Sequence, residues 1–154
     1  GLCLNLPVGF NLNLPVFHKI STGGLIRSGE EKTRSDKQMR DLRIVAASRS
    51  VDALTLSGGN QQKIVIGKWL SHGARLFIFD EPTVGVDVGT KAEIYRLFGE
   101  LLKQGAGIIL ISSYLPEVYE LSDRLHVFRG GRLVASHDHR VASHEDVLTQ
   151  AIGI

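Results

Sequence analysis

Two short apolar runs constrain the fold of this chain more than any other feature. Residues 76–79 and 107–111 are almost entirely apolar, and the segment 90–103 between them has apolar residues at helical spacing. Such runs are typical of strands that are buried on both faces of a parallel sheet. Because parallel neighbours need a long crossover connection, the order strand, helix, strand predicts a βαβ unit. The predicted fold class is therefore α/β.

The other C-terminal elements follow from local patterns. Thr90 and Glu93 form a capping box at the start of the predicted helix, and Gly105 is placed to end it. Residues 124–135 predict a closing hairpin that turns at the glycine pair near its middle. A short helix is expected from residue 143 onward.

The N-terminal third has weaker patterns. Residues 1–24 are interrupted by prolines and a glycine pair, so they are expected to be extended or irregular. Residues 31–48 are expected to form an amphipathic helix, because Met39, Leu42 and Ala46 recur at helical spacing. Basic and acidic residues are interleaved in this region, which fits a solvated helix face; a nucleic-acid surface is the alternative.

The composition narrows the class of protein. With 43% hydrophobic and 22% charged residues and a net charge of +2, the chain has the composition of a globular rather than a disordered protein. No apolar run approaches the roughly 18–20 residues that span a bilayer. The single cysteine, Cys3, rules out a disulfide within the chain and agrees with a reducing compartment.

Two carboxylates follow the first apolar run directly. Open α/β sheets bind ligands at the carboxyl ends of their strands, so Asp80 and Glu81 would lie at a binding crevice. In phosphoryl-transfer enzymes an aspartate in this position holds Mg²⁺, and an adjacent glutamate can polarise the attacking water. The pattern alone is equally compatible with an acidic loop after a buried strand.

A glycine pair precedes another apolar segment. Ser57, Gly58 and Gly59 stand just before residues whose spacing predicts a helix. The backbone N–H groups and the dipole at such a helix N-terminus attract anions, and glycines let a phosphate approach closely. The Ser57 hydroxyl would add a donor. Taken alone, a plain glycine-rich helix start remains the alternative.

In combination these segments resemble the ABC ATPase family. Residues 56–63 match its signature motif, residues 76–81 its Walker B strand with the adjacent glutamate, and residues 86–87 its D-loop. The amino-acid sequences of segments 60–63 and 82–89 are similar to those in the second cassette of tandem sugar-import ATPases. These ATPases serve ribose, galactose, xylose and related uptake systems.

The resemblance implies a fold and a function. The fold would be a partial P-loop NTPase sheet with an α-helical subdomain. Residues 1–73 would form the helical subdomain region ending in the signature helix, and residues 74–154 the Walker B half of the α/β core. The function would be that of an ATP-binding and hydrolysing subunit that energises carbohydrate import. A non-catalytic cassette acting in assembly and a soluble ABC ATPase acting on nucleic acid or ribosomes are the alternatives.

The resemblance also assigns roles to residues and implies partners. Glu81 is the implied catalytic base, and Asp80 the implied ligand of Mg²⁺ beside ATP. Asp87 is the D-loop residue, and Ser113 stands at the switch position, where most ABC cassettes have histidine. The signature residues would bind, in trans, the nucleotide of a partner cassette: Ser57, Gly58, Gly59 and Asn60. The implied partners are that cassette and membrane permease subunits, with no nucleic acid, at the cytoplasmic face of the cell membrane.

One family motif is missing from this sequence. The Walker A pattern G-x-x-x-x-G-K-[ST] does not occur, since the only Gly-Lys pair, Gly67-Lys68, is followed by Trp69. The Q-loop is missing as well, so the chain is expected to be a C-terminal cassette fragment. Because phosphate positioning is most of what a protein contributes to this reaction, the chain alone is expected neither to bind ATP tightly nor to hydrolyse it. An exposed sheet edge is also expected, with possible self-association through it.

Overall fold

The computed structural model describes residues 1–70, 72–138 and 141–153, and these residues form two compact units. Unit 1 comprises Gly1–Phe77 and Thr83–Gly107, and unit 2 comprises Ile78–Pro82 and Ile108–Ile154. These units are defined by packing, whereas the boundary expected at residue 73 was based on motifs, so that boundary stays a prediction. None of the described helices has the length and apolar character that a membrane crossing requires.

Unit 1 begins with helical segments rather than irregular chain. They are α1 (Val8–Asn13), η1 (Leu14–Val16) and α2 (Phe17–Ile20). The expectation of extended or irregular chain over residues 1–24 is therefore wrong for residues 8–20. Buried Asn11 organises this region, because its Nδ2 donates to the carbonyl oxygens of Cys3, Leu6 and Pro7 at 2.9, 3.1 and 3.1 Å. Pro7 itself occupies the N-cap of α1, where a proline costs no helical hydrogen bond.

A two-stranded antiparallel pair, β1 (Ser21–Thr22) and β2 (Leu25–Ile26), leads into the helix α3 (Ser28–Asp41). This helix replaces the one expected over residues 31–48, so both predicted ends were wrong. Its exposed side carries ion pairs between neighbouring turns, such as Arg27 with Glu30 at 2.9 Å. These pairs agree with a solvated helix face.

The early end of α3 has a backbone cause. Arg43 has a positive φ of 50°, in the left-handed region that glycine usually occupies at a helix end. The Arg43 N–H donates to Arg40 O at 3.0 Å, and the Ile44 N–H donates to Met39 O at 2.9 Å. This pair of bonds is the Schellman ending, which turns the chain away from the helix.

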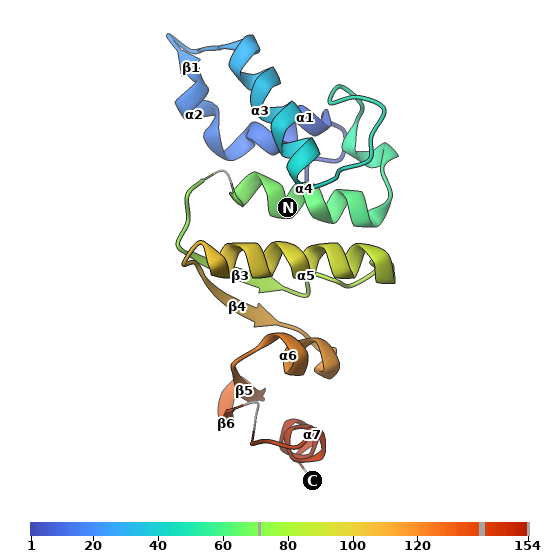
Figure 1. The fold of residues 1–154 in the computed structure, drawn as a ribbon, viewed down its shortest axis with the longest axis vertical. Helices are drawn as coiled ribbons and strands as arrows, with labels where there is room; N and C mark the ends of the chain where they lie inside the picture. The colour runs from blue at the N-terminus through green and yellow to red at the C-terminus, as the bar shows by residue number, and fades with distance from the viewer. Residues whose placement is uncertain (71, 139–140, 154) are drawn as a thin grey trace. The chain divides into compact units, whose positions relative to one another are not determined.

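Two further helices complete unit 1. They are α4 (Gly58–Leu70) and α5 (Val88–Lys103), which lie side by side (Figure 1). A helix following the Gly58-Gly59 pair is confirmed. The predicted capping box is not formed, because Asp87 caps α5 by accepting the Thr90 N–H at 3.0 Å. The core of unit 1 joins α1, α4 and α5 to the segments between them: Val8, Leu12, Leu42, Ile44, Ala53, Ile64 and Leu97.

The two apolar runs pair as β3 (Leu76–Asp80) and β4 (Gly107–Ile111). The Gly107 N–H donates to Arg75 O, and the Glu81 N–H donates to Ile111 O, each at 2.8 Å. From the first bond to the second, the residue numbers increase along both strands. The strands are therefore parallel, as the βαβ unit requires.

The expectation that both faces of these strands are buried is wrong. Phe77 is buried, but Ile78 is 63% exposed and Ile109 is 47% exposed. Among the described residues β3 and β4 pair only with each other, and successive side chains of a strand point to opposite faces. One apolar face therefore meets solvent. Self-association through the sheet edge stays a prediction.

Unit 2 contains a helix, a hairpin and a last helix. They are α6 (Leu115–Leu121), β5 (Arg124–Arg129), β6 (Arg132–Asp138) and α7 (His144–Ile152). The predicted hairpin is confirmed, with Gly130 and Gly131 at φ 57° and 76° in the turn, and the predicted C-terminal helix is confirmed as α7. The core of this unit consists of Leu125, Val127, Ala142 and Val147.

Candidate functional site

The structure gathers the predicted site residues in two places. The first is the signature turn, which we define as residues 57–60, together with the start of α5; it belongs to unit 1. The second is the carboxylate end, which we define as residues 80–81, together with Ser113; it belongs to unit 2. Each place is described by itself.

The signature turn is an ordered helix N-terminus. The Ser57 hydroxyl oxygen accepts the Asn60 N–H at 3.4 Å and the Asn60 Nδ2 at 3.0 Å, and Ser57 O accepts the Gln61 N–H at 2.9 Å. Ser57 is thus the N-cap residue of α4. The N–H groups of Gly58 and Gly59 stand in the first helical turn, which has no intrahelical acceptors. Together with the helix dipole they form a place where an anion is stabilised.

The Asn60 side chain is used within the protein. Its Oδ1 accepts the Val45 N–H at 2.9 Å, which ties the signature turn to the loop after α3. The prediction that Asn60 binds nucleotide stays a prediction. In this structure its amide holds the turn in shape.

The start of α5 packs against the signature turn. Gly59 is buried, and a Cβ built on it would lie 2.8 Å from Thr90 Oγ1 and 2.9 Å from Thr90 Cγ2. Thr90 is in turn bonded to Asp87, with its hydroxyl donating to Asp87 Oδ2 at 2.7 Å. These hydrogen bonds from Thr90 hold the pKa of Asp87 below its ordinary value. Asp87 and Gly59 are therefore joined through Thr90.

A buried lysine fixes the next turn of the same helix pair. Lys63 in α4 is 4% exposed and forms an ion pair with Glu93 of α5. Its Nζ also donates to Arg43 O at 3.0 Å. A buried ammonium needs such partners, because leaving it unpaired away from water is costly. The ion pair holds α4 against α5 one turn below the signature turn.

The carboxylate end lies where β3 stops. Asp80 is the last residue of β3 and is exposed, whereas Glu81 is half-buried. Glu81 Oε1 accepts the Ser113 N–H at 2.8 Å. Glu81 also has a positive φ of 48°, an uncommon conformation for a side chain of this size. Strained backbone of this kind is concentrated at functional sites.

Ser113 contacts Glu81 through its backbone. The structure brings the Ser113 N–H, and not its side chain, to the Glu81 carboxylate. The preceding Ser112 is fixed as well, since its hydroxyl donates to Glu117 Oε2 at 2.9 Å and accepts the Tyr114 N–H at 3.1 Å. A backbone donor is available whichever side chain stands at residue 113.

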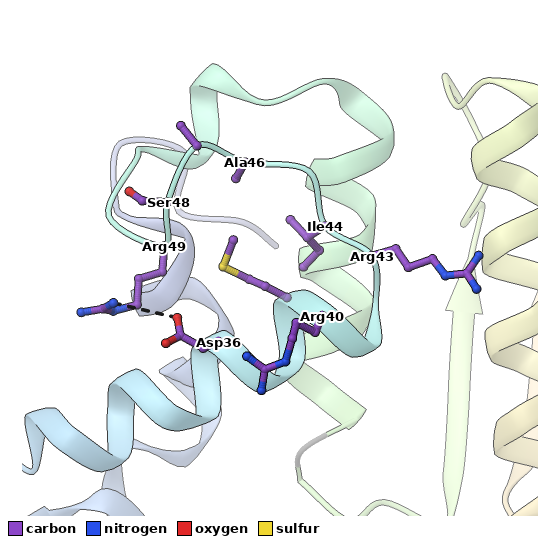
Figure 2. A pocket seen from close by; sticks show the side chains of 9 residues that line it. Asp36, Arg40, Arg43, Ile44, Ala46, Ser48 and Arg49 are labelled. Carbon is purple, nitrogen blue, oxygen red and sulfur yellow. Dashed lines mark ion pairs between the residues drawn. The ribbon is translucent and has the colours of Figure 1, made fainter.

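An open hollow of about 480 Å³ lies between the end of α3 and the loop that follows it (Figure 2). Arg49 pairs with Asp36 at 3.9 Å. The guanidinium groups of Arg40, Arg43 and Arg49 point in three different directions, so they do not converge on one anion (Figure 2). These contacts therefore do not indicate a phosphate-binding site in the hollow.

The histidines near β6 have protein contacts. His137 Nε2 lies 2.6 Å from Gln150 Oε1, and the His144 ring stacks edge-on against Tyr119. His139 lies outside the described residues. Among the residues that the structure describes, no three His, Cys, Asp or Glu side chains are grouped to hold a metal ion.

The supporting contacts of Thr90, Lys63 and Val45 were not predicted from the sequence. Each supports the signature turn through a contact with a residue distant in sequence. Only Thr90 had a local signal, because Asp87 stands three residues before it in the spacing of an N-cap and its acceptor. The contact of Thr90 with Gly59 carries no sequence signal.

Comparison with known proteins gives a family match. Residues 8–84 match the family model described as ABC transporter. The chain is 44% identical over 153 residues to the ribose import ATP-binding protein of Geobacillus kaustophilus, covering 99% of the chain and 31% of the relative. It is likewise 44% identical to the ribose import ATP-binding protein of Bacillus subtilis, with the same coverage. The chain thus spans about a third of the length of these relatives.

Solved structures share the fold. A dimeric ATP-binding cassette in a post-hydrolysis state, bound to ADP and Pi, matches with a TM-score of 0.77 and 20% identity, over 91% of this chain and 60% of that one. An inward-facing transporter of putative metal-chelate type matches with a TM-score of 0.81 and 15% identity, over 100% and 61%. The partial P-loop NTPase fold with its helical part is confirmed by these likenesses.

Proposed function

Because this chain belongs to the ABC transporter family of ATP-binding proteins, we propose that it forms the signature and Walker B part of an ATPase subunit that drives sugar import. The similarity to ribose import ATP-binding proteins over nearly the whole chain supports a sugar as the transported substrate. Permease subunits in the membrane would be the partners, which places the subunit at the cytoplasmic face as a peripheral component.

The observation that carries the proposal is the prepared state of the signature turn. The turn is capped by Ser57, tied to the loop after α3 through Asn60 and packed against Thr90. The amides of Gly58 and Gly59 therefore need no rearrangement to meet an anion, and preorganised donors are worth more than donors that must be ordered on binding. We assign the γ-phosphate of ATP held by a partner cassette as that anion.

The carboxylate end would act on the magnesium ion and on the attacking water. Mg²⁺-ATP, when bound, supplies the phosphoryl group and a divalent charge. Asp80 fits as the magnesium ligand, because it is an exposed carboxylate at a strand end and Mg²⁺ prefers oxygen donors. Glu81 would accept a proton from the attacking water, and the Ser113 N–H would keep its carboxylate oriented.

Retention of both carboxylates favours a catalytic subunit over a cassette kept only for assembly. A nucleic-acid function lacks support from the charge pattern, because acidic residues stand among the basic ones of α3 and Lys37 is paired with Asp41. The interleaved charges are typical of a solvated surface.

The 154-residue chain by itself is expected to show no micromolar binding of Mg-ATP. It contains no Walker A loop, and cradling the β- and γ-phosphates is the main source of nucleotide affinity in this family. Isothermal titration calorimetry is the measurement, with the Bacillus subtilis ribose import ATP-binding protein as a positive control. A low-micromolar dissociation constant for the chain would contradict the proposal that its signature serves a nucleotide held elsewhere.

A further inference from the structure

The space between Gly59 and Thr90 is filled. A Cβ on Gly59 would lie 2.8, 2.9 and 3.2 Å from Thr90 Oγ1, Cγ2 and Cβ, all closer than ordinary contact. The neighbouring Gly58 is different, because a Cβ there would meet only Gly85 O, at an ordinary 3.5 Å. Thr90 therefore sets how closely the second signature glycine approaches α5.

The Thr90 side chain is held in one orientation. Its hydroxyl donates to Asp87 Oδ2 at 2.7 Å, while its backbone N–H donates to Asp87 Oδ1 at 3.0 Å. Threonine is β-branched and stiff at χ1, so fixing the hydroxyl also fixes the methyl group that faces Gly59. The state of the Asp87 carboxylate is thereby linked to the position of the signature turn.

Moving α4 and α5 apart near Gly59 and Thr90 would be costly. Lys63 and Glu93 form their ion pair one turn further along, and Lys63 Nζ is also bonded to Arg43 O. Moving α4 away from α5 would break contacts of a buried ammonium, which is costly. A misfit between Gly59 and Thr90 is therefore expected to displace the N-terminal turn of α4 instead.

We propose that Thr90 is a positioning residue of the signature turn, which it spaces through Gly59 and links to the D-loop residue Asp87. Thr90 does not touch nucleotide in this role; it sets where the Ser57 hydroxyl and the first amides of α4 stand. The consequence for nucleotide capping rests on the function proposed above.

A double-mutant cycle on Gly59 and Thr90 tests the spacing. Two readouts are used: the backbone amide NMR shifts of residues 57–60 in this chain, and its ATP-dependent association with a partner cassette. That partner is an ABC cassette with its own Walker A loop and with glutamine in place of its catalytic glutamate. Gly59→Ala is expected to shift the amides and to weaken association by at least about tenfold, whereas Gly59→Ala in a Thr90→Ala background should weaken it by less than about threefold.

The hydroxyl link is tested with variants of Thr90 alone. Thr90→Ser keeps the donor to Asp87, whereas Thr90→Val keeps the shape and removes the donor. We expect Thr90→Val, and not Thr90→Ser, to raise the pKa of Asp87 and to shift the amides of residues 57–60. The matched control is Thr33→Val on α3, where an exposed hydroxyl donates to Gly29 O; it should change neither quantity.

The outcomes separate the two proposals. If Gly59→Ala has the same effect whatever stands at residue 90, or if Thr90→Val leaves the pKa of Asp87 and the amides unchanged, Thr90 is not a positioning residue. If the wild-type chain does not associate with the ATP-loaded partner, the proposed function fails. Thr90 is then judged on the amide shifts and the pKa of Asp87 alone.

Discussion

With Glu81 replaced by glutamine, ATP hydrolysis at the carboxylate end is expected to fall by about 10²–10⁴-fold, the usual contribution of a general base. Glutamine has the shape of glutamate and keeps an oxygen that can accept the Ser113 N–H. It cannot take a proton from water at neutral pH. The loss should therefore come from the chemical step, with ATP binding retained.

The measurement needs a protein with a Walker A loop. A hybrid can be made by exchanging the aligned segment of the Bacillus subtilis relative for this chain, which matches it over 153 residues. Any second catalytic glutamate of that relative is replaced beforehand, so that phosphate release reports on Glu81. Glu120→Gln, at an exposed glutamate of α6, is the matched control and should stay within about twofold of the parent. A Glu81→Gln rate within a few-fold of the parent would remove Glu81 from the reaction.

Replacing Gly67 by alanine is expected to destabilise unit 1, although alanine is the better helix former. A Cβ on Gly67 would overlap Leu42 Cδ1 and lie 3.3 Å from Leu12 Cδ2, and both leucines are buried in the core. Overpacking of this kind costs about 2–3 kcal/mol, and the helix-propensity gain offsets about 1 kcal/mol of it. The free energy of unfolding should therefore fall by about 1–2 kcal/mol.

Urea unfolding of the chain measures this effect, and the chain supplies two controls. Gly99 in α5 has nothing within 4 Å of its missing Cβ, so Gly99→Ala should raise the free energy of unfolding by about 0.5–1 kcal/mol. In a Leu42→Ala background, where the overlapping methyl group is gone, Gly67→Ala should cost nothing. Stabilisation by Gly67→Ala in the wild-type background would show that α4 does not pack on Leu42 as described.

The motifs could be predicted from the sequence because their chemistry is local. Ser57 caps a helix whose first turn contains two glycines, and Asp80 and Glu81 follow an apolar strand directly. Each pattern specifies a backbone shape as well as a chemical group. For the same reason the hairpin was found from its glycine pair, because glycine readily adopts the positive φ angles that a tight turn requires.

The N-terminal helices could not be predicted in this way. Asn11 and Pro7 are residues that favour turns, and here they favour helix because Asn11 is buried and bonds three carbonyl groups around Pro7. The end of α3 was missed for a similar reason. Arg43 takes a left-handed conformation without glycine's conformational freedom, so no residue type marked the end of the helix.

Tertiary contacts explain what remained unpredicted in the site. Two contacts join α4 to α5 although their partners are about thirty residues apart in the sequence. They are the contact of Thr90 with Gly59 and the ion pair of Lys63 with Glu93. The exposed face of β3 and β4 was likewise unpredictable from the apolar runs. Burial of a strand depends on the elements that pack on its faces, and the apolar runs do not mark that Phe77 is covered while Ile78 is left exposed.

The central claim is that the signature turn of this chain serves a nucleotide held by another cassette. Its most direct test is whether the 154-residue chain associates with the hydrolysis-deficient partner cassette. Sedimentation velocity, with and without Mg-ATP, measures this association. Ser57→Asp is the diagnostic variant, because aspartate caps a helix as well as serine does but repels phosphate. Ser50→Asp, in the loop before η2 (Ala53–Thr55), makes the same charge change outside the turn. We predict association that requires ATP, is lost in Ser57→Asp and persists in Ser50→Asp. Association that is independent of ATP, or equal in the two variants, would contradict the claim.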